Sequence, residues 1–247
     1  MDKLIKDLRA NLLSNLDVSI RHEAHWQLPV QEYDVTFGRV KRFKMDILMK
    51  MLLLAFQETD IRRAANLADM LFVEELFVRD LIEKMERTGL IYLEKKGYKL
   101  TAKGYDYLEK GIFEEDMDAE QTLISYSAAH DEYLLAKADE QPDIEESVPL
   151  YRYGVEGEAD WDRMAELLAK EELGSAEDNF QVLVTDVVDC EEIETRYVRC
   201  IEFQLYDQKQ DIFFARVWNT LFQKWDETLE KQIEEHEVVA WREAMLS

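Results

Sequence analysis

The sequence predicts an α+β protein made of two parts that differ in charge. Through Ile112 the chain has 19 basic and 18 acidic residues, a net charge of +1, whereas the remainder has 11 basic and 36 acidic residues, a net charge of −25. Apolar residues recur about every four positions in some segments and every second position in others, and these periods are typical of amphipathic helices and half-buried strands. A chain of 247 residues has room for two such folded parts.

The composition also limits the function. The overall net charge of −24 excludes a protein that binds nucleic acid over its whole surface. The N-terminus lacks the pattern of a signal peptide, and the longest apolar stretch, residues 45–56, contains Asp46 and Lys50 and is too short to cross a bilayer. We therefore expect a cytoplasmic protein that does not engage a membrane.

Residues 1–43 predict a helix followed by an extended arm. Leu4 and Leu8 lie on one face of a helix that would span the first 16 residues. Pro29 excludes a helix interior in the segment 26–37, where apolar and polar residues alternate as in a strand.

Residues 44–112 predict a module of four helices and one β-hairpin. Its boundaries follow from residues that cap helices and from a glycine in the turn between two short apolar runs. The expected elements are an apolar helix over Met45–Phe56 that is buried on all sides, a helix capped by Asp60, a helix from near Glu74 to Gly89, a hairpin that turns at residues 94–97, and a helix capped by Thr101.

This order of elements resembles the winged helix-turn-helix superfamily. The residues that carry the resemblance are Leu67–Leu71, Leu81–Ile91 and Tyr98–Gly104. A helix followed by Gly-Leu-Ile, a hairpin and Leu-Thr-x-x-Gly is typical of bacterial winged helices. The resemblance covers about residues 44–112, under a third of the chain. It implies a domain whose third helix enters the major groove of DNA and whose wing reaches the backbone.

Contact with phosphate needs Lys, Arg or polar donors on the exposed face of the third helix. The candidate nucleic-acid-binding residues are Arg39, Lys41, Arg42, Lys44, Arg62, Arg63, Arg79, Lys95 and Lys96. Glu74 and Glu75 oppose this role, because carboxylates in the first turn of the third helix repel phosphates. The alternative is that the cations solubilise the module or form salt bridges with the acidic half.

Leu76 and Phe77 are the candidate partner-binding residues. Both lie beside the outer surface of the predicted third helix, and an exposed apolar pair often marks an interface. The alternative for Phe77 is a place in the core.

The second half predicts an acidic helix and linker over residues 113–149 and an acidic α+β domain over residues 150–247. The helix would extend to Leu135, and the linker would follow from residue 137. The C-terminal domain would contain a helix at Trp161–Leu173, strands at Phe180–Val188, Tyr197–Tyr206 and Ile212–Val217, and a long closing helix from Trp218. The strands would form an antiparallel meander covered by the closing helix.

Histidines and cysteines give little indication of an active site. His22 and His25 are one residue too close for the His-Glu-x-x-His zinc pattern, and His130 and His236 are expected on the surface. Two cysteines are too few for a disulfide scaffold. We expect Cys190 and Cys200 to be buried free thiols, and a disulfide across a hairpin is the alternative.

Acidic residues give one weak indication of catalysis. Asp186 and Glu202, on adjacent strands, would hold Mg²⁺ as in metal-dependent nucleases. Gln204 occupies the position where such nucleases usually carry a lysine, which favours an ordinary solvated loop and an outward-facing Glu202. The sequence has no phosphate-binding glycine loop and no nucleophile elbow. We therefore predict no metal, no cofactor and no catalytic residue.

These features predict a non-enzymatic adaptor or accessory subunit of a nucleic-acid-associated assembly. The winged helix would dock a protein partner, DNA or both. The acidic domain would offer a second interface to a basic protein surface or to another copy of the chain. Two alternatives remain: a stand-alone DNA-binding transcriptional regulator whose C-terminal domain senses or dimerises, and a metal-dependent nuclease built on Asp186 and Glu202.

Overall fold

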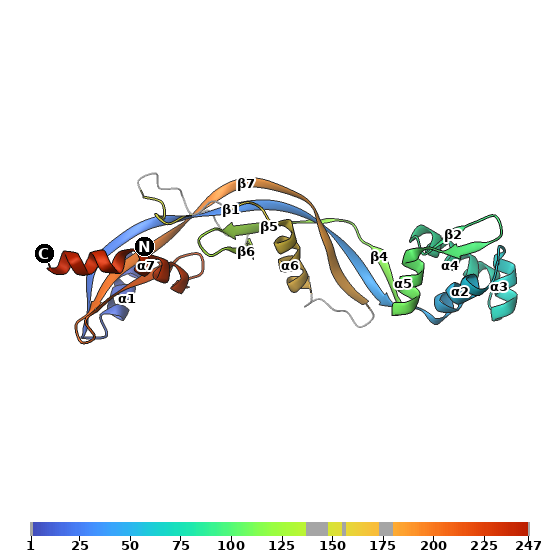
Figure 1. Cartoon of the computed structure of the whole chain (residues 1–247), viewed down its shortest axis with the longest axis horizontal. Helices are drawn as coiled ribbons and strands as arrows, with labels where there is room; N and C mark the ends of the chain where they lie inside the picture. The colour runs from blue at the N-terminus through green and yellow to red at the C-terminus, as the bar shows by residue number, and fades with distance from the viewer. Residues whose placement is uncertain (1, 137–147, 155–156, 173–179, 247) are drawn as a thin grey trace. The chain divides into compact units, whose positions relative to one another are not determined.

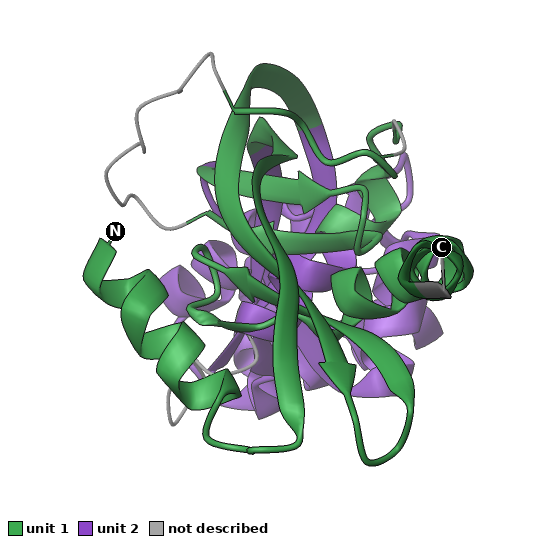
Figure 2. Ribbon diagram, turned by 90° about the vertical axis from the view of Figure 1, so that its left-hand side faces the viewer, with its two compact units in different colours: residues 1–35, 121–164, 189–247 green, residues 36–120, 165–188 purple. Residues whose placement is uncertain are grey.

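A computed structural model of the chain describes residues 2–136, 148–154, 157–172 and 180–246 (Figure 1). The chain divides into two compact units. Unit 1 comprises residues 1–35, 121–164 and 189–247, and unit 2 comprises residues 36–120 and 165–188 (Figure 2). Each unit therefore combines segments that are distant in the sequence.

The predicted α+β class is confirmed, since both units contain helices and strands. Unit 1 contains α1 (Asp2–Leu12), β6 (Glu132–Leu135), β8 (Ile212–Asn219), β9 (Lys224–Trp225) and α7 (Glu227–Leu246). Unit 2 contains α2 (Ile47–Glu58), α3 (Ala64–Leu71), α4 (Glu75–Arg87), β2 (Ile91–Leu93), β3 (Tyr98–Leu100), α5 (Ala102–Lys110) and β4 (Ile112–Asp116). Four elements contribute residues to both units: β1 (Val18–Lys44), β5 (Glu120–Ser127), α6 (Trp161–Glu172) and β7 (Phe180–Asp207).

The main sheet has the strand order β6-β5-β1-β7-β8-β9, and β4 pairs with β1. The pairs β1–β4, β5–β6, β7–β8 and β8–β9 are antiparallel. β2 and β3 form a separate antiparallel hairpin.

Unit 1 buries apolar side chains on both faces of its sheet. Neighbouring residues of a strand point to opposite faces, so Cys200 and Ile201 of β7 belong to different clusters. Ile201 packs with Leu8 of α1. Cys200 packs with Leu229 of α7. The two helices therefore cover opposite faces of this part of the sheet.

α7 also closes the outer edge of β8. β9 pairs only with the last two residues of β8, so backbone N–H groups nearer its start need other acceptors. Ala215 donates to Oε1 of Glu234 with an N···O distance of 2.8 Å, and Val217 donates to Oε1 of Glu230 at 3.0 Å. Burial raises the pKa of Glu230, and the N–H of Val217 offsets part of that rise.

Unit 2 has its own core among α2, α3, α4, α5 and the β2–β3 hairpin (Figure 1). The predicted order of three helices, a hairpin and a fourth helix is present. Local signals set several boundaries. Asp46 caps α2 by accepting from the N–H of Leu48 at 2.8 Å, and Thr101 caps α5, as predicted, by accepting from the N–H of Gly104 at 3.0 Å.

Two details predicted for this segment are wrong. α2 is not buried on all sides, because Ile47, Met51 and Leu54 are exposed. Asp60 does not cap α3, which begins at Ala64. Its carboxylate instead accepts a hydrogen bond from Nζ of Lys99 at 2.5 Å.

The helix predicted up to Leu135 is also wrong, because this segment forms β4, β5 and β6. Tyr126 and Tyr133 lie opposite each other in β5 and β6, and their ring centroids are 4.5 Å apart. Cross-strand aromatic pairs of this kind stabilise a sheet. Most of the predicted linker, residues 137–147, lies outside the described residues.

The three-strand meander predicted for this region is correct only in part. Its last two strands pair antiparallel within β7 and β8, whereas its first strand is the beginning of β7, and β9 falls in a segment that was predicted to be helical. β7 is one strand rather than two, and the closing helix begins at Glu227 rather than Trp218. Trp218 and Trp225 lie opposite each other in β8 and β9 with ring centroids 5.3 Å apart. Their spacing in the sequence fits a helix face as well as a tight hairpin, which explains the error.

Candidate docking surface

The turn between α3 and α4 places an aromatic side chain in solvent. α3 is followed by Phe72, whose φ of 55° lies in the left-handed region and whose N–H caps the helix by donating to the carbonyl of Ala68. Glycine is common at such helix ends, because a side chain in this conformation costs about 1–2 kcal/mol. The Phe72 side chain is 96% exposed. It therefore gains almost no packing that would offset this cost.

Further large apolar side chains are exposed around the same turn. The inner face of α4 is buried through Val78, Ile82 and Met85. Outside it, the exposed fractions are 60% for Met70, 96% for Phe72, 63% for Leu76 and 53% for Phe77. We name these four residues the α3–α4 apolar surface. The four fall within a segment of eight residues, and groups of exposed apolar side chains are typical of interaction surfaces.

Two of the four residues of this surface were predicted from the sequence. Leu76 and Phe77, the predicted partner-binding residues, both belong to it, and the alternative that Phe77 lies in the core does not hold. Met70 and Phe72 were missed. A large aromatic residue between two helical patterns, at a position where glycine is common, was the available signal.

Acidic side chains border the α3–α4 apolar surface. Asp69, Glu74, Glu75 and Asp80 are all exposed. Arg79 is also exposed, but its Nη2 is 2.9 Å from Oε1 of Glu75, so this cation is neutralised locally. The border is therefore negatively charged.

A cavity of about 430 Å³ adjoins α3, α4 and β3. Its apolar lining includes Ile82 and Tyr98, and its carboxylates are Glu75, Glu83 and Glu86. Arg63 and Arg79 also line it. With three carboxylates and two guanidinium groups, the walls carry a small net negative charge.

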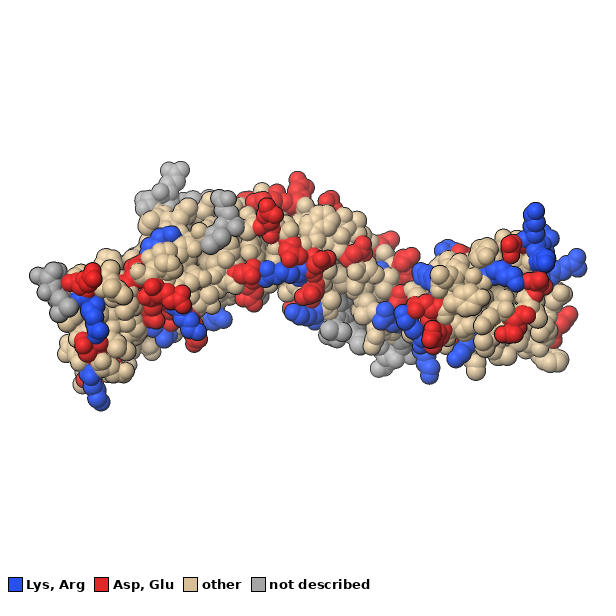
Figure 3. Space-filling view, in the orientation of Figure 1, with Lys and Arg blue, Asp and Glu red and all other residues tan. Residues whose placement is uncertain are grey.

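The structure brings four of the predicted nucleic-acid-binding residues together. The hairpin turn that carries Lys95 and Lys96 lies against Ile61, because Tyr98 donates its N–H to the carbonyl of Ile61 at 2.9 Å. A Cβ on Gly97 would lie 2.6 Å from the same carbonyl oxygen. This contact places the hairpin turn beside the residue that directly precedes Arg62 and Arg63. Figure 3 shows Lys and Arg side chains gathered at this hairpin, and none of the four forms a salt bridge within the part of the chain that the structure describes.

The predicted cations on β1 are arranged differently. Arg42 lies opposite Glu114 of β4, and its Nε is 2.6 Å from Oε1 of that carboxylate. Arg39 pairs with Glu120. Lys41 lies over the ring of Phe180, 4.8 Å from its centroid, and Lys44 is exposed. Consecutive residues of a strand face opposite ways, so Arg39 and Lys41 lie on one face of β1 and Arg42 and Lys44 on the other. The four cations therefore do not form one basic surface.

Burial affects the β1–β4 ion pair. It raises the pKa of Glu114, but the hydrogen bonds from Tyr107 and Arg42 outweigh that effect and hold the pKa below its usual value. Burial and the same carboxylate raise the pKa of Tyr107. The Glu114 carboxylate is therefore charged at neutral pH and unavailable as a proton donor.

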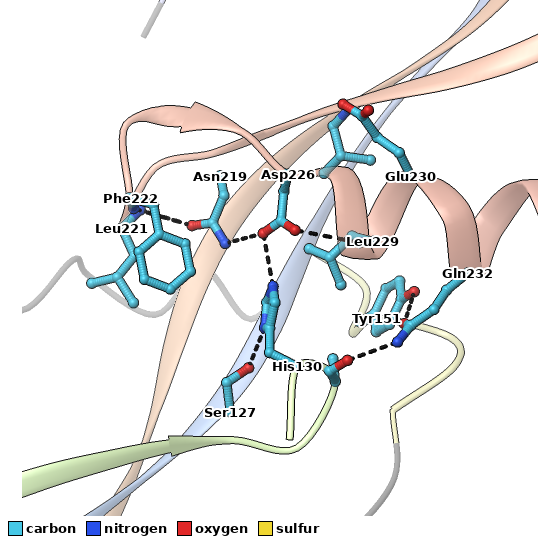
Figure 4. Close-up of polar contacts among 12 residues, drawn as sticks. Ser127, His130, Tyr151, Asn219, Leu221, Phe222, Asp226, Leu229, Glu230 and Gln232 are labelled. Atoms are coloured by element: carbon cyan, nitrogen blue, oxygen red, sulfur yellow. Dashed lines mark hydrogen bonds and ion pairs between the residues drawn. The ribbon is translucent and has the colours of Figure 1, made fainter. Parts of the chain in front are cut away.

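His130 was expected on the surface, but only 8% of its side chain is exposed (Figure 4). Its Nδ1 lies 2.7 Å from Oγ of Ser127, and its Nε2 lies 2.9 Å from Oδ2 of Asp226. Asn219 donates to the same carboxylate oxygen at 2.9 Å. Burial raises the pKa of Asp226, but the hydrogen bonds from His130 and Asn219 outweigh it and lower the pKa overall.

Ser127, His130 and Asp226 have the composition of a catalytic triad, but their environment is structural. The Ser127 residue is only 2% exposed, so a substrate could not reach its hydroxyl. Asp226 also caps α7, since its Oδ1 accepts from the N–H of Leu229 at 3.3 Å. The three side chains tie the turn between β5 and β6 to the start of α7.

The remaining histidines do not form a metal site. His22 and His25 lie on β1 rather than on a helix, so residues three apart point to opposite faces. His25 pairs with Glu23. His236 is exposed, as predicted, and stacks on Tyr153 with ring centroids 4.3 Å apart.

The acidic residues of the nuclease hypothesis are not on adjacent strands. Asp186 and Glu202 both lie on β7. Glu202 does not face outward: its carboxylate accepts from Nε1 of Trp26 at 2.7 Å and from both Nη atoms of Arg152 at 2.8 and 2.9 Å. Among the described residues, no group of three or more His, Cys, Asp or Glu side chains could hold a metal ion.

Cys190 and Cys200 are both free thiols, and both lie on β7. Cys200 is buried and Cys190 is partly exposed. Burial raises the pKa of both thiols, which makes them poor nucleophiles.

Comparisons of the chain with protein-family models, curated proteins and solved structures found no match. None of the helices in the described residues is long and apolar enough to span a membrane.

Proposed function

We propose that unit 2 contains a winged helix-turn-helix fold and serves as the docking module of a non-enzymatic adaptor or accessory subunit in a nucleic-acid-associated assembly. In this proposal the module binds a protein partner through the α3–α4 apolar surface. The order α2, α3, α4, β2–β3, α5 supports the fold. The observation that carries the function is the joint exposure of Met70, Phe72, Leu76 and Phe77.

Burying these side chains would supply useful binding energy. Complete burial of one such side chain contributes about 1.5–3 kcal/mol. A few apolar anchors at the centre of an interface often provide most of its affinity. The left-handed backbone at Phe72 supports the same role, because residues held in sparsely populated backbone regions cluster at functional sites.

A second candidate function is contact with DNA, as in a transcriptional regulator. The observation that favours it is the cluster of Arg62, Arg63, Lys95 and Lys96, which no salt bridge in the described residues neutralises. Glu74 and Glu75 at the start of α4 oppose entry of this helix into a groove, because they would repel phosphates.

Protein docking is tested by capture on the immobilised full chain from a nuclease-treated extract of its native host. The comparison is between the wild type, Phe72→Asp, Leu76→Asp and the control Leu16→Asp. Leu16 is 95% exposed and belongs to unit 1, so the control adds the same charge elsewhere. A genuine partner is retained by the wild type and the control and is lost from both surface variants, whereas equal retention by all four proteins refutes the proposal.

DNA contact is tested by fluorescence anisotropy with a labelled duplex over a range of salt concentrations. Arg62→Glu and Lys95→Glu should abolish binding and the control Lys209→Glu should not, because Lys209 is exposed in unit 1. No binding by the wild-type protein at low salt would rule out this candidate.

A further inference from the structure

We infer that the partner of the α3–α4 apolar surface presents a cationic amphipathic segment, in which apolar side chains are flanked by Lys or Arg. This inference rests on the proposed docking function and adds the chemistry of the occupant. It follows from two features of unit 2: the charge of the border around the apolar side chains, and the lining of the neighbouring cavity.

The border selects against an anionic partner. Asp69, Glu74 and Asp80 are exposed next to Phe72 and Leu76 in the sequence of α3 and α4. An acidic peptide or a phosphate backbone placed over the apolar side chains would meet these charges, whereas Lys or Arg side chains would pair with them.

The cavity provides a place for such a cation. Ile82 and Tyr98 offer an apolar lining for the methylene chain of a Lys or Arg side chain. Glu83 and Glu86 offer carboxylates to its charged end, and together with Glu75 they outnumber the two guanidinium groups of the lining, Arg63 and Arg79. A segment whose apolar residues cover Leu76 and Phe77 could therefore direct a neighbouring basic side chain along α4 into the cavity.

The probes are two labelled peptides of 16 residues, each patterned as an amphipathic helix. One contains Leu and Lys and the other contains Leu and Glu. Binding to the full chain is measured by fluorescence anisotropy at low and moderate salt. We expect the Leu/Lys peptide to bind at least tenfold more tightly than the Leu/Glu peptide, and its affinity to fall as salt rises.

Variants separate a specific site from general attraction to an acidic protein. The double change Glu74→Lys and Asp80→Lys should weaken Leu/Lys binding about tenfold or more. The matched control, Glu191→Lys with Glu192→Lys, alters the net charge equally at exposed positions of unit 1. We expect this control to change the affinity less than threefold. An equal loss in both double variants would overturn the inference, because the peptide would then be held by net charge alone.

Two further outcomes distinguish this inference from the proposed function. If both peptides bind equally and both are lost in the double variant Phe72→Ser with Leu76→Ser, the docking surface stands and the preference for a cation is wrong. If that variant binds the Leu/Lys peptide as the wild type does, both proposals fail. Binding of a labelled duplex oligonucleotide by the wild type, with loss of that binding in Phe72→Ser with Leu76→Ser, would assign the surface to nucleic acid and overturn the inference.

Discussion

Unit 1 places charged side chains in its interior and gives them partners, whereas unit 2 leaves large apolar side chains in solvent. In unit 1, Glu202 is held by Trp26 and Arg152, and Asp226 is held by His130 and Asn219. In unit 2, the α3–α4 apolar surface has no such enclosure. The buried polar contacts of unit 1 join elements far apart in sequence and serve its fold. The exposed apolar groups of unit 2 contribute little to its own fold and are available to a partner.

The largest expected effect tests whether the buried polar contacts of unit 1 stabilise its fold. Asp226→Ala removes the acceptor of two buried donors and the cap of α7, and we expect unit 1 to lose about 3 kcal/mol of unfolding free energy. All five tryptophans belong to unit 1, so urea unfolding followed by tryptophan fluorescence reports on this unit. The control is Glu191→Ala, which removes an exposed carboxylate of unit 1 and should change little.

Equal stability of the two variants would show that the contacts around His130 do not contribute to the fold. The buried serine, histidine and aspartate would then need another explanation, and the case against a catalytic role would be weaker.

The next largest expected effect is on the unfolding free energy at low pH. The pKa of Asp226 is lower in the folded protein than in the unfolded chain. Its contribution to the unfolding free energy is therefore fully present above the unfolded pKa of about 3.9, and it is lost as the pH falls through the folded pKa. The difference in unfolding free energy between the wild type and Asp226→Asn should therefore shrink as the pH falls below about 4. Urea unfolding at a series of pH values measures it, and a difference that grows with acidity would contradict the assigned hydrogen bonds.

The β2–β3 hairpin of unit 2 should be less tolerant of substitution than its exposed position suggests. Gly97→Ala would bring a Cβ within 3 Å of the backbone of Ile61, and we expect a loss of about 1–2 kcal/mol from unit 2. Hydrogen exchange at the amides of β2 and β3 measures it. Lys96→Ala, on the same turn but exposed, is the control. Unchanged protection in Gly97→Ala would mean that the hairpin does not rest on Ile61.

Features that a local signal sets could be predicted from the sequence, whereas features that depend on distant segments could not. The boundaries at Thr101 and at the β2–β3 turn were predictable, because one residue or one short turn sets each of them. The environment of His130 was not, because Ser127 is near in the sequence but Asp226 is contributed by the start of a distant helix. Asp186 and Glu202 were placed on separate strands because no local signal shows that β7 continues through the acidic segment between them.

The candidate surface shows the same limit. Leu76 and Phe77 could be predicted from the helical period of α4, since they fall outside its buried face. Phe72 could not, because its exposure depends on a left-handed backbone at the end of α3 and not on a periodic pattern.

The smallest expected effect separates binding from stability at one residue. Phe72→Gly should raise the unfolding free energy of unit 2 by about 1 kcal/mol, because glycine adopts the left-handed conformation without strain and the exposed phenyl ring contributes almost no packing. Phe72→Ala is the matched control: it also removes the ring but keeps a Cβ in the strained conformation, so it should not be stabilised. Hydrogen exchange in α3 and α4 measures both variants, and both should lose the captured partner equally. A destabilised Phe72→Gly variant would show that the ring supports the fold of unit 2. The statement that the exposed apolar side chains of unit 2 contribute little to its own fold would then be wrong for Phe72.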